Sequence, residues 1–239
     1  HLKRKRLNLS GLEFLILDEA DEMLNKGFIE EIEIILEKTN KDKKTFLFSA
    51  TMPKMVLTIA QNYMTDPLTI TTKASNRLAS RTKQFFHEVS KNDKLQALYR
   101  ILDSYTDIYG IIFCRTKRDV DDISDKLIQA KYPVEALHGD LSQAQRNKIV
   151  EKFRKRVCKI LVATDVAARG LDIMDLTHVI NFALPQDSES YVHRIGRTGR
   201  AGREGTAITL ITPGEFYGIQ RLQRTLKTTI EKKPIPSIE

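Results

Sequence analysis

The sequence predicts an α/β protein built from parallel sheets with helices on both faces. Short apolar runs, partly β-branched, alternate with stretches of helical length throughout the 239 residues. Continuous apolar strands separated by helices are typical of a doubly wound parallel sheet that is buried on both faces. The predicted strands are 14–17, 45–48, 111–114, 134–137, 160–163, 179–182 and 207–211. The clearest helical spacing falls on 29–36, 94–102, 120–130 and 145–153.

A change of composition divides the chain. Residues 71–83 are rich in Ser, Thr and basic side chains and have little apolar periodicity, which indicates a linker. The part after it holds enough strand–helix units for a complete domain, whereas the part before it offers too few strands to close such a sheet. We therefore predict a truncated first domain at 1–75, a linker at 76–83, a complete second domain at 84–230 and the start of a C-terminal extension at 231–239.

The bulk composition is that of an ordinary soluble globular protein, with 41% hydrophobic and 29% charged residues. No apolar run approaches the ~20 residues that span a bilayer. Cys114 and Cys158 lie in or beside apolar runs, so we expect buried thiols in a reduced, cytoplasmic setting. Residues 1–75 contain 11 basic and 11 acidic side chains, so the whole net charge of +8 lies in residues 76–239. A basic half fits a polyanionic partner such as nucleic acid, and it also fits solubility alone.

Two carboxylates end the first apolar strand, in the sequence FLILDEAD at residues 14–21. The carboxyl end of a strand is where α/β sheets place ligands. An Asp there, Asp18, can hold Mg²⁺ against nucleotide phosphates through water, and the next residue, Glu19, can orient or deprotonate an attacking water. The alternative is an acidic helix N-terminus stabilised by the helix dipole.

Four arginines fall within ten residues, between His193 and Arg203, and glycines separate them. Planar, permanently charged donors at this spacing suit converging contacts to phosphate, and glycines allow the backbone to approach a ligand closely. A flexible arginine–glycine segment is the alternative, and the flanking strand and helix start argue against it.

Two further features complete the pattern. Ser49, Ala50 and Thr51 follow a predicted strand and precede Pro53, which by itself is an ordinary helix N-cap. None of the 11 glycines is followed by lysine, so the chain has no phosphate-binding P-loop.

Taken in order, DEAD at 18–21, SAT at 49–51, ATDVAARGLD at 163–172 and HRIGRTGR at 193–200 resemble the motifs of the DEAD-box RNA helicase family. The segments NKGF at 25–28 and HGDLSQAQR at 138–146 are similar to the family's intervening sequences. The resemblance implies two RecA-like domains that close around ATP, Mg²⁺ and single-stranded RNA.

The resemblance also implies roles for individual residues. Catalysis would fall to Asp18, Glu19, Arg197 and Arg200, with Mg²⁺ at Asp18 and with Asp172, Arg197 and Arg200 on the nucleotide. Coupling between the domains would fall to Asp21, Ser49, Thr51, His193 and Arg194. RNA contacts would come from Phe113, Arg115, Thr116, Gln143, Arg146, Thr164, Asp165, Arg169 and Gly170.

The function implied is ATP-dependent RNA helicase activity, with sequence-independent contacts to the RNA backbone and protein partners at the C-terminal extension. An ATP-gated RNA clamp would use the same motifs, and a DNA helicase of the same superfamily is a third hypothesis. Because the chain has no P-loop, we expect the 239 residues alone not to hydrolyse ATP.

Overall fold

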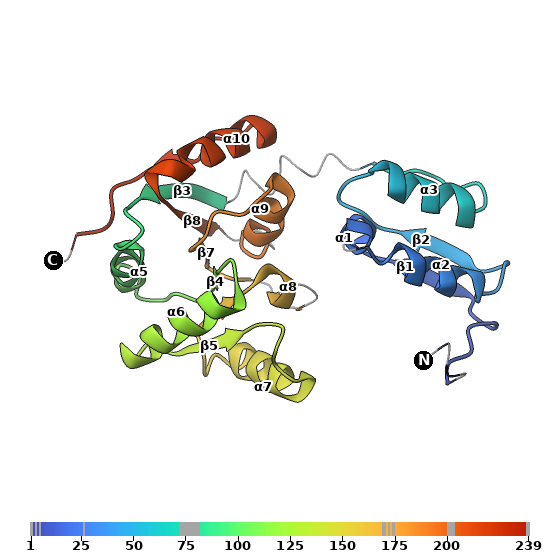
Figure 1. The fold of residues 1–239 in the computed structure, drawn as a ribbon, viewed down its shortest axis with the longest axis horizontal. Helices are drawn as coiled ribbons and strands as arrows, with labels where there is room; N and C mark the ends of the chain where they lie inside the picture. Colours follow the sequence, from blue (N-terminus) through green and yellow to red (C-terminus); the bar gives the residue numbers. More distant parts are fainter. Residues whose placement is uncertain are drawn as a thin grey trace. The chain divides into compact units, whose positions relative to one another are not determined.

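The computed structural model describes residues 2, 4, 6–25, 27–71, 82–168, 171, 173, 175–199 and 204–237. The chain divides into two compact units, His1–Thr72 (unit 1) and Lys73–Glu239 (unit 2), which are described separately (Figure 1). No helix in these ranges is long and apolar enough to cross a membrane.

Unit 1 contains a pair of parallel strands with three helices on one face. The strands are β1 (Phe14–Leu17) and β2 (Lys44–Leu47), and the helices are α1 (Ala20–Asn25), α2 (Ile29–Glu37) and α3 (Lys54–Tyr63). Leu15, Leu17 and Leu47 pack against a buried cluster that all three helices supply. Because side chains alternate along a strand, Phe14, Ile16 and Phe46 face the other way, and each is at least 45% exposed.

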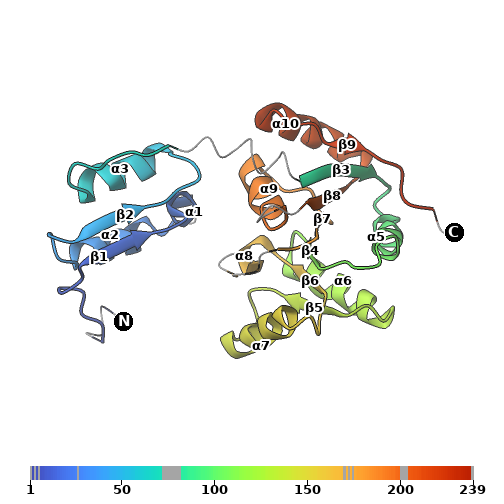
Figure 2. The ribbon, with the colours of Figure 1, turned by 180° about the vertical axis from the view of Figure 1, so that it is seen from behind.

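Unit 2 contains, among its described residues, a parallel sheet of seven strands in the order β5-β6-β4-β7-β8-β3-β9 (Figure 2). The strands are β3 (Thr82–Glu88), β4 (Gly110–Phe113), β5 (Val134–Leu137), β6 (Ile160–Ala163), β7 (His178–Asn181), β8 (Gly205–Ile211) and β9 (Glu231–Lys232). The helices are α5 (Lys94–Asp103), α6 (Lys117–Gln129), α7 (Gln143–Arg154), α8 (Asp165–Ala168), α9 (Ser188–Ile195) and α10 (Phe216–Leu226), with a 3₁₀ turn η1 (Pro213–Glu215).

Helices cover both faces of this sheet, as the sequence predicts. Ile112 and Val162 point to the face covered by α5 and α6, whereas Ile111 and Leu161 point to the opposite face, beside α7 and α8. Helices α9 and α10 cover the same face as α7 and α8, over β8 and β3. The central strands β4, β6 and β7 are buried at every position, which explains the continuous apolar sequences of β4 and β6.

The strand order creates a switch point between β4 and β7. The chain leaves β4 toward β5 on one side and leaves β7 toward β8 on the other. These neighbours lie very close together, since a Cβ atom on Gly110 would stand 2.5 Å from the carbonyl oxygen of His178. In doubly wound sheets, ligands bind outside the carboxyl ends of the strands at such a point.

The observed element boundaries differ from the predicted ones at the starts of two helices and near the two ends of unit 2. Helices α6 and α7 begin earlier than their apolar spacing suggested, because Thr116 with Asp119 and Ser142 with Gln145 form capping boxes ahead of the apolar face. Strand β3 begins at Thr82, inside the predicted linker, and β9 lies inside the predicted C-terminal extension. Both belong to the sheet of unit 2, where they pair with each other.

Candidate functional site

The carboxyl ends of β1 and β2 in unit 1 are joined through Asp21. This side chain is fully buried, and its Oδ2 accepts hydrogen bonds from the Thr51 backbone N–H at 2.7 Å and the Thr51 hydroxyl at 2.8 Å. The Asp21 N–H donates to Ser49 Oγ at 3.2 Å, and the Ser49 hydroxyl donates to the Thr51 carbonyl at 2.6 Å. The structure therefore brings Asp21 together with Ser49 and Thr51, which lie 28 and 30 positions later in the sequence.

Asp18 and Glu19 form the turn between β1 and α1, and both are exposed. Glu19 has a φ of 51°, a left-handed conformation that is costly for a residue other than glycine. The turn is fixed on both sides, because Asp18 Oδ1 accepts the Glu19 N–H at 2.9 Å and the Ala20 N–H donates to the Phe48 carbonyl at 3.1 Å. Lys131 and Lys227 adopt the same conformation just after helices, so the position of Glu19 at the carboxyl end of β1, together with this conformation, supports a role for it.

The carboxylates of this turn suit a magnesium ion that keeps most of its water. Within the described residues, no three His, Cys, Asp or Glu side chains lie close enough to hold a metal between them. Mg²⁺ needs less than that, since it is commonly bound by one or two carboxylates together with waters and phosphate oxygens. The exposed Asp18 carboxylate fits this role, and it would hold the ion through water.

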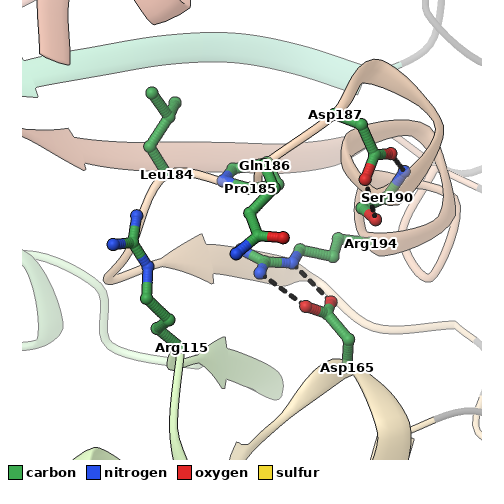
Figure 3. Close-up of a pocket in the computed structure, with 8 residues that line it drawn as sticks. All are labelled: Arg115, Asp165, Leu184, Pro185, Gln186, Asp187, Ser190 and Arg194. Carbon is green, nitrogen blue, oxygen red and sulfur yellow. Dashed lines mark hydrogen bonds and ion pairs between the residues drawn. The ribbon is translucent and has the colours of Figure 1, made fainter.

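In unit 2, the carboxyl ends of β6 and β7 are joined by an ion pair between a buried arginine and a half-buried aspartate. Arg194 of α9 is 4% exposed and makes a two-pronged contact to Asp165, with Nε–Oδ1 at 2.6 Å and Nη2–Oδ2 at 2.8 Å (Figure 3). Its Nη1 donates to Asn181 Oδ1 and to the Ala183 carbonyl, both at 2.9 Å. The guanidinium also lies 5.0 Å from the centre of the Phe113 ring. A planar fork with matched acceptors is the strongest arrangement available to an arginine.

These contacts bear on the roles that the sequence predicted for two residues. Phe113 was expected among the RNA contacts, but its side chain is 2% exposed and lies in the core beneath Arg194. Arg194 was expected to couple the two domains, and within unit 2 its guanidinium is bonded to Asp165, Asn181 and Ala183. The Phe113 side chain is therefore not presented to a ligand and supports Arg194 from the core.

A hollow of about 150 Å³ lies above this ion pair, at the switch point of the sheet. Its lining consists of Arg115, Asp165, Leu184, Pro185, Gln186, Asp187, Ser190 and Arg194 (Figure 3). Arg115 follows β4 directly and is exposed. Its guanidinium has no hydrogen-bond or ion-pair partner in the part of the chain that the structure describes, so it is available to an anion.

Three of the remaining predicted RNA contacts lie at helix starts on the same edge of the sheet, and Arg146 lies within α7. Thr116 caps α6 after β4, Gln143 opens α7 after β5, and Thr164 precedes α8 after β6, where its Oγ1 accepts the Ala167 N–H at 3.4 Å. Because parallel strands end on one edge, these residues share the edge with Arg115. Helix N-termini of this kind favour anions.

The arginine-rich segment after α9 is described only in part. His193 is half-buried in the last turn of α9, and Arg197 follows the helix, where its Nη1 donates to the Leu171 carbonyl at 3.2 Å. Four of the predicted site residues lie outside the described residues, namely Arg169, Gly170, Asp172 and Arg200.

One supporting residue was missed from sequence, and the helix start predicted at 187–190 is confirmed. Asn181 is fully buried at the end of β7, where it accepts from Arg194 and donates to Thr209 Oγ1 at 3.1 Å. A polar residue inside the apolar sequence VINF was the available signal, because a buried amide requires partners. Asp187 caps α9 by accepting the Ser190 N–H at 2.6 Å.

The two cysteines are buried and free, as expected. Burial raises the pKa of the Cys114 thiol to about 12 and that of the Cys158 thiol to about 11. Thiols that stay protonated are poor nucleophiles and poor metal ligands, so the cysteines belong to the packing and not to the site.

Two family models match this chain. The model described as DEAD/DEAH box helicase matches residues 1–59, and the model described as helicase conserved C-terminal domain matches residues 93–202. Among curated proteins, the DEAD-box ATP-dependent RNA helicase CshA of Bacillus cereus is 47% identical over all 239 residues, which cover 46% of that protein. CshA of Bacillus subtilis is 45% identical, with 48% of its length covered. The chain therefore spans about half the length of the curated relatives that it matches.

Solved structures give the same result. Dbp5 of S. cerevisiae bound to RNA and ADP BeF3 is 30% identical with a TM-score of 0.89, over 98% of this chain and 62% of that one. SrmB of E. coli, solved with the regulator of ribonuclease activity A, is 32% identical with a TM-score of 0.61, over 66% of this chain and 96% of that one. The fold of each unit is RecA-like. With these similarities, the chain belongs to the DEAD-box helicase family.

Proposed function

We propose that this chain acts within an ATP-dependent RNA helicase, in which ATP hydrolysis drives the separation of RNA strands or the remodelling of RNA–protein complexes. The observation that supports it most is the DEAD turn itself. Exposed Asp18 and strained Glu19 stand beside a buried Asp21 that is bonded to Ser49 and Thr51. One short segment thus joins a site for nucleotide chemistry to a fixed link between two strand ends.

The residues of this chain would contribute to hydrolysis in distinct ways. Bound Mg²⁺ would neutralise phosphate charge, and Asp18 would hold it through water. Glu19 would orient and deprotonate the attacking water. Arg197 and Arg200 would stabilise the charge that develops on the phosphate oxygens, and Asp172 would contact the ribose of the nucleotide.

Coupling to RNA would depend on the polar links at the strand ends. Because Asp21 fixes the positions of Ser49 and Thr51, a shift of the DEAD turn is transmitted to the end of β2. In unit 2, Arg194 holds Asp165 and the end of β7 in one arrangement, which supports His193 and Arg197 on α9 and just after it.

RNA would bind along the strand-end edge of unit 2. Arg115, Thr116, Gln143, Arg146 and Thr164 would contact phosphate and ribose directly, with Arg169 and Gly170 beside them. Asp165 and Phe113 would act indirectly, because both hold the Arg194 guanidinium in place. The net charge of +8 carried by residues 76–239 supports sequence-independent, salt-sensitive binding. The named relatives and RNA-bound Dbp5 favour RNA, which a protein distinguishes from DNA by its 2′-hydroxyls. A cytoplasmic setting and protein partners at residues 231–239 are part of the same proposal.

The test is a chimera in which this chain replaces the matching 239 residues of the Bacillus cereus relative. We expect RNA-stimulated ATP hydrolysis, and Glu19→Gln should lower turnover by about 10²-fold while ATP and RNA still bind, because only the base is lost. Glu30→Gln, at an exposed position of α2, is the matched control and should retain full activity.

Two results would change the proposal. A folded chimera without RNA-stimulated turnover, or one in which Glu19→Gln costs less than about tenfold, would contradict the role of the DEAD turn. A chimera that hydrolyses ATP but separates no strands would replace the helicase with an ATP-gated RNA clamp.

A further inference from the structure

Helix α10 presents a narrow stripe of one aromatic and two basic side chains to solvent. Ile219 and Leu222 are buried against the sheet, and Phe216 and Leu226 pack on the same cluster. Tyr217, Arg221 and Arg224 follow the spacing i, i+4, i+7, which places them together on the opposite side of the helix. We call these three residues the α10 stripe.

The stripe combines an exposed aromatic ring with positive charge. Tyr217 is 81% exposed, an unusually large exposure for an aromatic side chain, and both arginines are exposed. Within the described parts of the chain, the side chains of Tyr217 and Arg224 take part in no hydrogen bond, ion pair or ring contact. Residues 216–228 include three basic side chains and no carboxylate. The stripe therefore has no internal partner that would neutralise it.

The stripe is continuous with the strand-end hollow of unit 2. Arg221 donates from Nη2 to the carbonyl of Gln186 at 2.9 Å, and Gln186 lines the hollow. One turn earlier, a methyl group on Gly218 would stand 2.4 Å from Leu184 Cδ2, so the helix packs directly on the wall of the hollow. Figure 3 shows Leu184 and Gln186 on the same wall, beside the unpartnered Arg115.

We propose that the α10 stripe is a second contact surface for single-stranded RNA, an inference that rests on RNA being the partner of the proposed function. A base stacks on Tyr217, while Arg221 and Arg224 contact the neighbouring phosphates. Stacking on an exposed aromatic ring beside basic side chains is the usual chemistry of sequence-independent single-strand binding. Arg221 can serve both contacts, because its bond to Gln186 uses only one of five N–H donors.

A protein partner fits the stripe less well. The core of a protein interface is depleted in charge, whereas this stripe carries two guanidinium groups around a single ring, with no exposed aliphatic side chain between them. Single-stranded nucleic acid supplies both a flat ring and regularly spaced negative charge, which match the two components of the stripe.

The experiment measures binding of a labelled single-stranded RNA to the 239-residue chain by fluorescence anisotropy at several salt concentrations. Tyr217→Ser should weaken binding about 10-fold, whereas Tyr217→Phe, which keeps the stacking ring, should stay within about twofold. The double variant Arg221→Gln, Arg224→Gln should lower the slope of log affinity against log salt by about 1.4, since each lost single-strand phosphate contact contributes about 0.7. The control is Lys131→Asn with Lys155→Gln, two exposed lysines just after α6 and α7 on the opposite edge of the sheet, and it should change neither quantity.

The outcomes separate this inference from the proposed function. RNA that fails to bind the unaltered chain at all would contradict the proposed function and with it this inference. RNA that binds the stripe variants and the lysine control equally well would overturn the inference alone. Equal losses in Tyr217→Ser and Tyr217→Phe would also overturn it, because the ring would not be what the RNA contacts.

Discussion

Strand β1 of unit 1 is as apolar as strands β4 and β6 of unit 2, and all three pair in parallel with their neighbours, but their surroundings differ. Every residue of β4 and β6 is buried, since helices cover both faces of that sheet. In β1 and β2 exposed and half-buried residues alternate, because the helices of unit 1 cover one face. Burial of an apolar strand is thus decided by the elements around it and not by its own residues.

The sites at the carboxyl ends of the strands in the two units also differ in how firmly they are held. Asp21 Oδ2 accepts hydrogen bonds from the backbone N–H and the hydroxyl of Thr51, and the Asp21 N–H donates to Ser49 Oγ. Asp165 is held by the buried guanidinium of Arg194. Removing one uncharged donor from a buried polar group costs about 1–3 kcal/mol, whereas removing the counter-ion of a buried guanidinium costs about 3–5 kcal/mol. We infer that the Asp165–Arg194 pair is the more rigidly held of the two sites.

Hydrogen exchange should show the largest contrast between the two regions. Amides of β4 and β6 should exchange only through global unfolding, about 5–15 kcal/mol above the native state, while amides at 15–17 and 46–48 should exchange through local opening. Mass spectrometry of the intact chain after timed exchange measures both sets at once. Equal protection in the two regions would contradict the conclusion that β4 and β6 are held more firmly by their surroundings than β1 and β2.

Removing the partner of the buried guanidinium should have the next largest effect. Asp165→Ala leaves Arg194, which is 4% exposed, without its counter-ion, so the free energy of unfolding should fall by about 3 kcal/mol. Urea denaturation measures the loss. The double variant Asp165→Leu, Arg194→Met removes both charges and should recover a large part of it. A loss below about 1 kcal/mol in Asp165→Ala would show that the pair is not rigid.

Acid should weaken unit 2 in particular, because of His178. This side chain is buried, its Nε2 has no partner within the described residues, and desolvation lowers its pKa to about 4. The unfolded chain takes up a proton near pH 6.5, so stability is complete above that pH and is lost as the pH falls from 6.5 to about 4. The loss is about 3 kcal/mol at most.

Urea denaturation at a series of pH values tests this. His178→Gln cannot take up the proton and should flatten the dependence. His87, whose pKa burial also lowers, contributes with the same sign and would account for any slope that remains. A profile that His178→Gln leaves unchanged would contradict the role of His178.

The smallest effect is expected at the contact between Asp21 and Thr51. Thr51→Val removes the hydroxyl that donates to Asp21 but keeps the backbone N–H bond, so unit 1 should lose about 1 kcal/mol. Thr51→Ser retains the hydroxyl and should lose less. A loss at Thr51→Val as large as that of Asp165→Ala would mean that the two sites are equally rigid.

Because apolar runs mark strands, the sequence allowed the strands to be predicted, although not the hydrogen bonds that join Asp21 to Ser49 and Thr51. It did not allow the pairing of Asp165 with Arg194, since that contact depends on how α9 packs over the sheet. Strand β3 escaped prediction for a similar reason. Its sequence TKQFFHE mixes polar and apolar residues, and its pairing with β8 and β9 makes it a strand.

The central claim is that the arginine segment of unit 2 serves the nucleotide and not the RNA. Arg197→Lys in the chimera tests it most directly, with ATP turnover and RNA affinity without nucleotide measured on the same preparation. A guanidinium placed against developing phosphate charge contributes about 10³-fold to turnover, so we predict a loss of that order with RNA affinity unchanged. RNA affinity that falls while turnover is retained would contradict the account and assign the segment to RNA binding.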